Sequence, residues 1–399
     1  MTKERSYTYY KKAFSEQPKP FAFVDLDFFD ANVLAVAERA GNKRIRIASK
    51  SIRCTELLRR ILEHSDQYQG IMCFTAGEAV WLSEQGFDDL LVAYPTLEPS
   101  ALKQIAQAIK KGRRIYLMTD KKAHLEAINA AGKAADVVLP VCLDLDVSSR
   151  YPSLHFGVHR SSLTNMEALK NYWKQLQQFP FVRLEGLMGY EAQIAGVGDQ
   201  TKGQGLKNKV IQQLQRHSIK QVRRKRAEAV AFLEKQLGQP LLFVNGGGTG
   251  SLESTQAEKA VTEVTAGSAF FSPTLFDHYS GFQHLPAAAY AIEIVRQPQA
   301  NIYTCLGGGY VASGMAGKDK VPQPYLPKGC QLNPNEMAGE VQTPIHYSGK
   351  EELKLGDPIF MRHSKAGELC ERFTQLFVLQ NDKLLGAWPT YRGEGQCFL

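Results

Sequence analysis

Short apolar runs alternate with helix-like stretches through the first two thirds of the chain, and this alternation constrains the fold more than any other feature. The runs that we interpret as strands are residues 21–26, 44–49, 70–75, 89–94, 114–119, 137–146, 183–190 and 241–246. Helical patterns are clearest at 30–40, 55–64, 76–85, 99–111 and 121–131. Alternation at this spacing predicts a parallel sheet. About eight such units closing on themselves make a (β/α)8 TIM barrel.

An open, doubly wound parallel sheet is the alternative that the same alternation allows. That fold usually carries a GxGxxG turn after its first strand, where the backbone meets a dinucleotide. No such turn follows residues 21–26. We therefore expect the barrel.

The pattern changes after about residue 276. Helical periodicity fades, and proline, glycine and aromatic residues become frequent. Short β-like runs remain at 288–295, 301–306, 358–362 and 376–379. We interpret this part as a β-rich domain. The expected fold class is α/β, with a barrel over residues 21–275 and a C-terminal β-rich domain over residues 276–399.

With 399 residues, of which 44% are hydrophobic and 22% charged, the chain is long enough for two domains without disulfide staples. Its seven cysteines form no CxxC pair, and an odd, scattered set is typical of reduced thiols in a cytoplasm. Residues 1–21 lack the apolar core of a signal peptide. No apolar run reaches about 18 residues, so we expect a cytoplasmic protein without membrane contact.

The formal net charge of +8 is partly local, because residues 216–226 read RHSIKQVRRKR. A nucleic-acid patch is one interpretation of this run. No interleaved aromatic residues or nucleic-acid motif accompany it, so we favour a solvated helix face. We expect a general attraction for small anionic metabolites, and no nucleic-acid partner.

Lys50 ends the strand-like run that begins at residue 44. Side chains alternate between the two faces of a strand. If Ile45 and Ile47 pack under helices, Lys50 points into the barrel at its carboxyl-terminal rim, where active sites of such barrels lie. Arg46 shares that inward face. A lysine at this place suits covalent chemistry, although an ordinary loop lysine fits the same pattern.

A glycine-rich turn, Asn245-Gly246-Gly247-Gly248-Thr249-Gly250-Ser251, follows a predicted strand. Glycines let the backbone approach an anion, so that N–H groups and hydroxyls can bind a phosphate. The turn is not a Walker A loop, because the GK[ST] ending is missing. A second segment, Thr265-Ala266-Gly267-Ser268, can complete a phosphate site at the rim. A plain glycine turn is the alternative.

Polar residues end two further predicted strands. Asp144 and Asp146 share one strand face, and Arg150 follows them. An arginine there can bind a phenolate or a carboxylate, whereas ion pairing inside the barrel is the structural alternative for the aspartates. Tyr190 ends the next strand. A lysine, a phosphate site and an Arg/Tyr pair on one rim suggest pyridoxal 5′-phosphate (PLP), which needs an amine, an anion site and ring contacts.

Segments spread along most of the chain carry a resemblance to a known family. They are Val24-Asp25-Leu26-Asp27 with Asn32, Ala48-Ser49-Lys50-Ser51, Phe74-Thr75 with Glu78-Ala79, Asp144-Leu145-Asp146 with Arg150, Gly189-Tyr190, Gly246-Gly247-Gly248-Thr249-Gly250, Glu263-Val264 with Gly267-Ser268, Cys370 and Trp388-Pro389. In these segments the chain resembles the fold-type III PLP enzymes with an alanine-racemase-like N-terminal domain. Within them it is most similar to the D-threonine aldolase and D-serine dehydratase branch, which includes proteins described as amino acid deaminase/aldolase.

The resemblance implies a role for each candidate site residue. Lys50 would hold PLP as a Schiff base, and Arg150 and Tyr190 would orient the cofactor. Small residues would bind its phosphate, namely Gly248, Thr249, Gly250, Gly267 and Ser268. The resemblance also implies that residues 1–20 join the β-rich domain, and that the protein is a homodimer.

The chain departs from this family at a metal-binding motif. The aldolase and dehydratase branch carries a His-x-Cys or His-x-Asp pair in its C-terminal domain. Aligning on Cys370 places Glu368 at the first position, and His363 lies a few residues earlier. All three side chains can ligate Zn²⁺. We therefore expect Zn²⁺ or Mn²⁺ as a candidate second cofactor, with a metal-free loop as the alternative.

The resemblance implies a PLP-dependent lyase that acts on D-amino acids, most of all on those with a β-hydroxyl group, and works as an aldolase or a dehydratase. A PLP-dependent amino acid racemase is one alternative, for which Tyr310 and Tyr325 are candidate second bases. A non-catalytic PLP carrier is another, although the large C-terminal domain argues against it.

Overall fold

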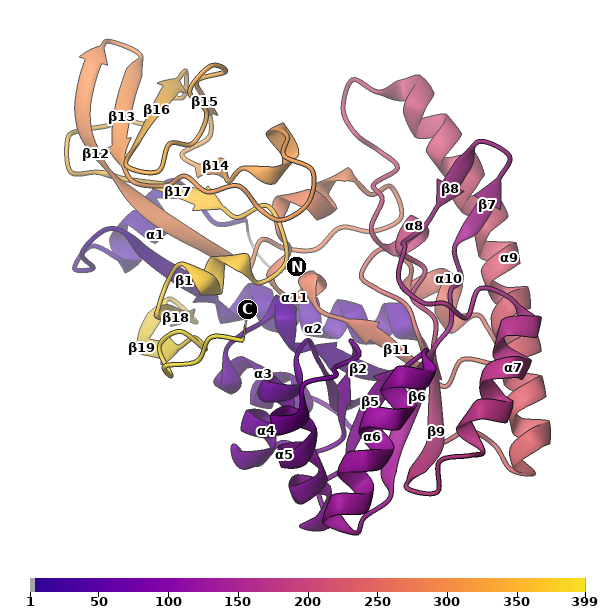
Figure 1. Cartoon of the computed structure of the whole chain (residues 1–399). Helices are drawn as coiled ribbons and strands as arrows, with labels where there is room; N and C mark the ends of the chain where they lie inside the picture. Colours follow the sequence, from indigo (N-terminus) through magenta and orange to yellow (C-terminus); the bar gives the residue numbers. More distant parts are fainter. Residues whose placement is uncertain (1–3, 399) are drawn as a thin grey trace. The chain divides into compact units, whose positions relative to one another are not determined.

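The computed structural model describes residues 4–398, which form two compact units (Figure 1). The barrel unit contains residues 37–50, 60–267 and 398, and the β-rich unit contains residues 4–36, 51–59 and 268–397. Residues 1–3 of the predicted N-terminal segment 1–20 lie outside the described residues. Among the described helices, none combines the length and the apolar character that crossing a membrane requires.

Within the described residues, eight parallel strands close into the barrel. In spatial order they are β2 (Arg44–Ala48), β3 (Tyr68–Cys73), β4 (Leu90–Val92), β5 (Ile115–Thr119), β6 (Leu139–Asp144), β9 (Val182–Met188), β10 (Phe243–Gly246) and β11 (Glu263–Ala266), which pairs with β2. The predicted fold class, a β/α barrel with a β-rich domain, is confirmed. A short hairpin of β7 (Ser149–Tyr151) and β8 (Leu154–Phe156) follows β6.

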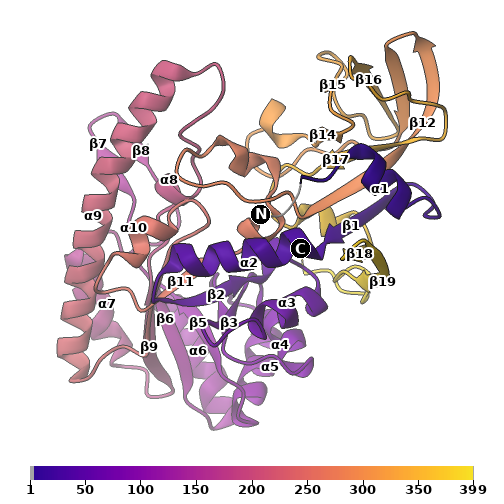
Figure 2. The same cartoon turned by 180° about the vertical axis from the view of Figure 1, so that it is seen from behind.

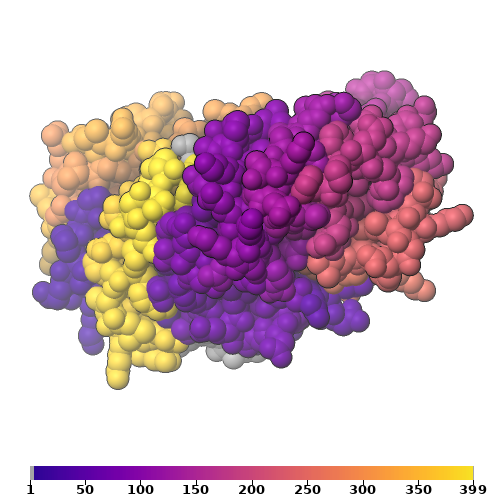
Figure 3. Space-filling model, turned by 60° about the horizontal axis from the view of Figure 1, so that its bottom comes forward, coloured from indigo at the N-terminus to yellow at the C-terminus, as the bar shows by residue number. Residues whose placement is uncertain are grey.

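Helices cover the outside of the barrel (Figure 2), and in Figure 3 the purple atoms of this unit form a continuous surface. The helices of the barrel unit are α4 (Ala76–Glu84), α5 (Pro99–Lys110), α6 (Lys122–Ala135), α7 (Met166–Leu176), α8 (Ala192–Ala195), α9 (Gly205–Leu237) and α10 (Leu252–Gln256). Local sequence explains several of their starts. Asn165 caps α7 by accepting from the backbone N–H of Ala168, and Pro99 opens α5. Helices α2 (Leu26–Ala40) and α3 (Thr55–Leu62) contribute residues to both units.

The barrel interior combines an apolar layer with a buried charge. The layer consists of Met72, Leu91, Tyr116, Met118, Cys142, Met188 and Phe243. Arg46 is buried, with its Nε 2.7 Å from an oxygen of Glu263 and its Nη1 2.8 Å from Asp89. Ile45 and Ile47 are completely buried on the opposite face of β2. The predicted alternation along this strand is therefore confirmed, but the charge of Arg46 is balanced by two carboxylates.

The β-rich unit is built on a mixed sheet, which has nine strands within residues 4–398. They are β1 (Phe21–Asp25), β12 (Ala288–Gln299), β13 (Ile302–Leu306), β14 (Gln323–Leu326), β15 (Cys330–Leu332), β16 (Gln342–Tyr347), β17 (Pro358–Arg362), β18 (Gln375–Gln380) and β19 (Lys383–Pro389). Its other helical segments are α1 (Tyr7–Ala13), α11 (Ser268–Phe271), η2 (Thr274–His278), η3 (Lys318–Lys320) and η4 (Glu368–Glu371).

One predicted barrel strand belongs to this sheet instead. Strand β1 pairs antiparallel with β12 and parallel with β18, so residues 21–26 are not part of the barrel. All five residues of β1 are buried and four of them are apolar, so this strand has the same pattern as a buried barrel strand. The place in the barrel is taken by β11, a four-residue strand that sequence analysis missed because Glu263 and Thr265 interrupt its apolar character.

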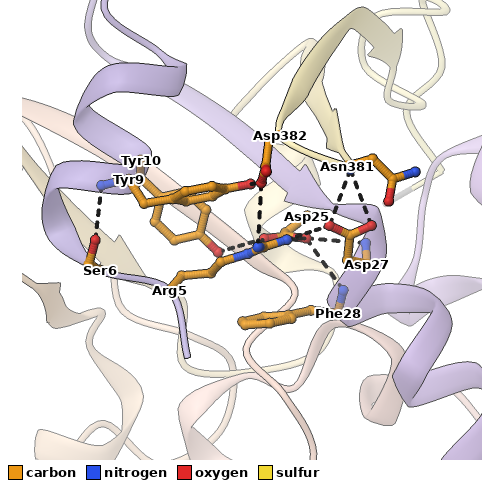
Figure 4. Close-up of polar contacts among 9 residues, drawn as sticks. All are labelled: Arg5, Ser6, Tyr9, Tyr10, Asp25, Asp27, Phe28, Asn381 and Asp382. Atoms are coloured by element: carbon orange, nitrogen blue, oxygen red, sulfur yellow. Dashed lines mark hydrogen bonds and ion pairs between the residues drawn. The ribbon is translucent and has the colours of Figure 1, made fainter. Parts of the chain in front are cut away.

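The N-terminal segment is bound to the sheet by charged and phenolic groups (Figure 4). The Nε of Arg5 lies 2.8 Å from Asp25, and the same guanidinium contacts Asp27. The Tyr10 hydroxyl donates to Asp25 at 2.9 Å. The Tyr9 hydroxyl donates to Asp382, in the turn between β18 and β19, at 2.7 Å. These contacts hold α1 against the end of β1.

Candidate functional site

Four neighbouring barrel strands end in the residues predicted to bind a cofactor. The strands β9, β10, β11 and β2 lie side by side in that order, and all four run parallel. Tyr190 follows β9, the glycine-rich turn follows β10, Gly267 follows β11 and Lys50 follows β2. Because parallel strands end at one rim, the fold brings these segments together on one arc of that rim.

Lys50 lies in a single turn of 3-10 helix, η1 (Ser49–Ser51), rather than on the strand itself. Strand β2 ends at Ala48, so the alternation that predicted an inward lysine stops two residues earlier. The Ser49 hydroxyl donates to the carbonyl of Met72 at 3.0 Å and fixes the turn to the neighbouring strand β3. The Lys50 side chain is exposed, at the carboxyl-terminal end of its strand.

The glycine-rich turn has backbone that other residues would strain. Gly247 has a φ of +88°, in the left-handed region that favours glycine. A Cβ on Gly248 would lie 2.8 Å from the Cβ of Ala195 and 3.2 Å from the Tyr190 ring. The backbone N–H of Gly248 donates to the Ser251 hydroxyl at 3.1 Å, and the carbonyl of Thr249 accepts from Arg39 at 2.7 Å. A side chain at residue 248 would therefore collide with Ala195 and Tyr190, so the turn needs a glycine here.

Gly267 and Ser268 mark a junction between the two units. Gly267 ends the β11 segment of the barrel, and Ser268 begins α11 in the β-rich unit. Within the β-rich unit, the hydroxyls of Ser268 and Ser51 lie 3.2 Å apart. Since Ser51 directly follows Lys50, the segments after β11 and β2 remain close beyond the strands.

Arg160, which sequence analysis missed, faces Tyr190. Its guanidinium carbon lies 5.5 Å from the centroid of the Tyr190 ring and 5.6 Å from that of Tyr94, which follows β4. Both distances are within the range of cation–π interaction. The predicted arginine, Arg150, lies instead on β7, with a side chain that is 63% exposed and 3.6 Å from Asp146. Arg160 is therefore the better candidate for orienting a cofactor ring.

Asp144, at the end of β6, lies near the same arginine. Burial, together with the charge of Asp120, raises the pKa of Asp144 to about 7, and the attraction of Arg160 opposes this shift only in part. A carboxyl group with such a pKa can hold or release a proton near neutral pH. Asp146 accepts from the backbone N–H of Ser148 at 2.9 Å and so stabilises the loop that follows β6.

Comparison with known proteins identifies the family. Residues 24–274, more than half of the chain, match the model of the alanine racemase N-terminal domain. The chain belongs to this family. The predicted resemblance is thus confirmed, and the matched residues include β2 with Lys50 and the glycine-rich turn.

Individual members of the family differ widely from this chain in sequence. A D-threonine aldolase of Arthrobacter sp is 24% identical over 63% of this chain, and the match spans only 60% of that relative's length. The crystal structure of D-threonine aldolase from Filomicrobium marinum has a TM-score of 0.78 at 18% identity, covering 94% of this chain and 96% of that one. D-threo-3-hydroxyaspartate dehydratase from Delftia sp. HT23 has a TM-score of 0.73 at 18% identity, covering 95% and 98%. These two structures share the fold.

The three predicted metal ligands do not form a metal site. His363 is buried, and its Nε2 contacts the carbonyl of Ala366 at 2.8 Å. The thiol of Cys370 donates to the carbonyl of Ile52 at 3.3 Å. The carboxylate of Glu368 accepts from the backbone N–H of Ser313 at 3.2 Å.

Each of these three side chains therefore contacts a polar group of the protein's own backbone. Among residues 4–398, no three His, Cys, Asp or Glu side chains come together as metal ligands. Burial also lowers the pKa of His363 to about 3 and raises that of the Cys370 thiol, as expected for buried groups. His363, Glu368 and Cys370 are therefore not gathered as metal ligands in this arrangement, and a bound metal stays a prediction.

The two tyrosines considered as racemase bases differ in their surroundings. Within the described residues, the Tyr310 hydroxyl is buried and has no hydrogen-bond partner. Arg372 lies 5.1 Å from the centroid of its ring. Burial raises the pKa of Tyr310, and it raises that of Tyr325 to about 12. Both groups therefore stay protonated at neutral pH in this arrangement.

Proposed function

We propose that this chain is a PLP-dependent lyase that acts on D-amino acids with a β-hydroxyl group, of the D-threonine aldolase or D-serine dehydratase type. One observation carries the proposal: four neighbouring strand ends bring together a lysine, a glycine-rich turn, and a tyrosine with an arginine over its ring. The names of the relatives support the same reaction classes.

The residues fit the parts of the cofactor. Lys50 would bind its aldehyde covalently, and the turn at Gly248, Thr249 and Gly250, with Gly267 and Ser268, would bind its phosphate. Tyr190 and Arg160 would contact the pyridine ring and its substituents. When bound, PLP supplies an electron sink for the charge that develops at the α-carbon of the substrate.

The protein's own groups would handle the protons. The Lys50 amine, exposed at the rim, is placed to act as the general base. A dehydratase would take the proton from the α-carbon, and an aldolase would take it from the β-hydroxyl. Asp144 can exchange a proton at neutral pH, because its pKa is raised to about 7. Arg160, next to it, offers a cation for an anionic group of the substrate or cofactor.

A racemase is the second candidate function. The buried hydroxyl of Tyr310, which has no hydrogen-bond partner within the described residues, is the specific observation in its favour, because a protonated tyrosine can donate a proton to the α-carbon. A homodimer in the cytoplasm, with amino acids as its small-molecule partners, remains our expectation for the protein's state in the cell.

Lysine mapping tests the core of the proposal. Protein incubated with PLP should develop a visible absorption band, and borohydride should convert it into a stable label on Lys50. Lys50→Ala should lose both the band and turnover, whereas Lys103→Ala, an exposed change on α5, should keep both. A label on another lysine would contradict the assignment.

A substrate panel then separates the reaction types. D- and L-isomers of β-hydroxy amino acids should be supplied one at a time, with glycine and ammonia measured separately. Glycine marks the aldolase and ammonia the dehydratase. Exchange of the α-hydrogen for deuterium without either product would favour the racemase.

A further inference from the structure

Arg226 is completely buried, although it lies in the basic run that the sequence suggested to be a solvated helix face. Helix α9 carries it beside the barrel, while Arg223 and Arg224 on the same helix are exposed. A buried guanidinium needs partners for its charge and its donors. Arg226 is therefore an internal residue of this run, and solvation does not explain its position.

Two carboxylates balance Arg226. Its Nη2 donates to Glu191 at 2.8 Å, and its Nη1 lies 2.6 Å from Glu258. Nη2 also donates to the carbonyl of Gly189 at 2.7 Å. Glu191 and Gly189 flank Tyr190 at the end of β9, so the arginine holds both sides of the segment that presents this tyrosine.

Glu191 also connects Arg226 to the glycine-rich turn through hydrogen bonds. Its second oxygen accepts from the Ser251 hydroxyl at 2.8 Å and from the Thr255 hydroxyl. The Ser251 hydroxyl in turn accepts from the backbone N–H of Gly248 at 3.1 Å. A continuous set of hydrogen bonds thus runs from Arg226 through Glu191 and Ser251 to the backbone of the turn.

The arginine also packs directly under the start of the turn. A Cβ on Gly246 would lie 2.8 Å from Nη2 of Arg226 and 2.9 Å from its Cζ. Only a residue without a side chain fits between the strand end and the guanidinium. The turn, in which Gly247 has a φ of +88°, is therefore fixed by two contacts: Arg226 packs against Gly246, and the Ser251 hydroxyl binds the backbone of Gly248.

We propose that Arg226 is a positioning residue for the phosphate site. Through Glu191 and Ser251 it fixes the turn at residues 247–251 in the conformation that receives a phosphate group, without touching that group itself. This inference rests on the proposed function, because the phosphate is that of PLP.

The test compares two ligands that differ only in the phosphate, PLP and pyridoxal, and measures the dissociation constant of each from the visible band. Arg226→Met should weaken PLP at least tenfold and change pyridoxal less than twofold. Arg226→Lys, which keeps the charge but loses the fork of donors, should fall in between. Arg224→Met, an exposed change two residues away, should behave as the wild type.

Ser251→Ala provides the same comparison if Arg226→Met does not fold, because it removes one hydroxyl and leaves the ion pairs in place. It should also weaken PLP selectively. Equal weakening of both ligands in the folded variants, or unchanged binding of both, would overturn the role of Arg226. A wild-type protein that binds neither ligand would instead refute the proposed function on which this role rests.

Discussion

The guanidinium of Arg160 lies 5.5 Å from the centre of the Tyr190 ring, although 29 residues separate the two along the chain. The segment that carries Arg160 follows the β7–β8 hairpin, and Tyr190 follows β9. This contact places a cation beside the ring that borders the glycine-rich turn. We therefore propose Arg160, in place of Arg150, for the role of orienting the cofactor.

Arg160→Met is expected to weaken PLP binding about tenfold or more, because a charged hydrogen bond contributes about 1.5–3 kcal/mol. Arg150→Met should change the same dissociation constant less than about twofold, since its exposed ion pair contributes little. The two constants can be measured by titration of the visible band. The reverse order of effects would restore Arg150 to the site.

Asp144 should make stability depend on pH. Its pKa is about 7 in the folded protein and 3.8 in its ordinary state, so the folded protein holds this proton more tightly. The resulting stabilisation is complete below pH 3.8 and is lost as pH rises through 7; it amounts to at most about 4 kcal/mol. Asp144→Asn should lack this loss. Urea titration at pH 5 and pH 8 gives the change in the free energy of unfolding between these pH values. An equal change in the wild type and in Asp144→Asn would refute the prediction.

The buried ion pair of Arg46 and Glu263 should be costly to break. Glu263→Gln is expected to lower the free energy of unfolding by about 3–5 kcal/mol, because it leaves a buried charge incompletely paired. Replacing all three charged groups, as Arg46→Met with Glu263→Leu and Asp89→Asn, should restore much of this loss, because no buried charge is then left without its partner. Asp88→Asn breaks the exposed pair with Arg114 and should cost less than about 1 kcal/mol. Denaturant titration of the three variants provides the comparison.

Changes in the η4 segment should leave the metal content as it is. Glu368→Gln and Cys370→Ala remove two of the three predicted ligands, whose side chains bind backbone groups instead. Elemental analysis of the purified variants should therefore match that of the wild type. Loss of one equivalent of zinc or manganese from either variant would show that these residues do hold a metal.

Local patterns were enough to predict that Lys50 and the glycine-rich turn each follow a barrel strand. Both depend on a strand followed by a particular short segment, which the sequence displays directly. The barrel could be predicted for the same reason, apart from the exchange of β1 and β11. Strand β11 carries Glu263 for the interior ion pair, and such a short, partly charged strand gives no periodic signal.

The contacts of Arg160 and Arg226 could not be predicted in this way. Each arginine has its role because of residues that only the folded chain brings near, Tyr190 for one and the pair of Glu191 and Glu258 for the other. In the sequence, Arg226 is indistinguishable from its exposed neighbours in the basic run. Burial of a charge follows from tertiary packing, so composition and spacing carry no trace of it.

The pairing of β1 has a consequence for how the protein is made. This apolar strand ends at residue 25, but its neighbours β12 and β18 begin only at residues 288 and 375. On the ribosome, the nascent chain therefore carries a mostly apolar strand with both edges unpaired until residue 288 is reached, and with one edge still unpaired until residue 375. Unpaired edges of this kind invite association with other chains. We expect the newly made protein to depend on a chaperone that shields this segment until the last strands emerge.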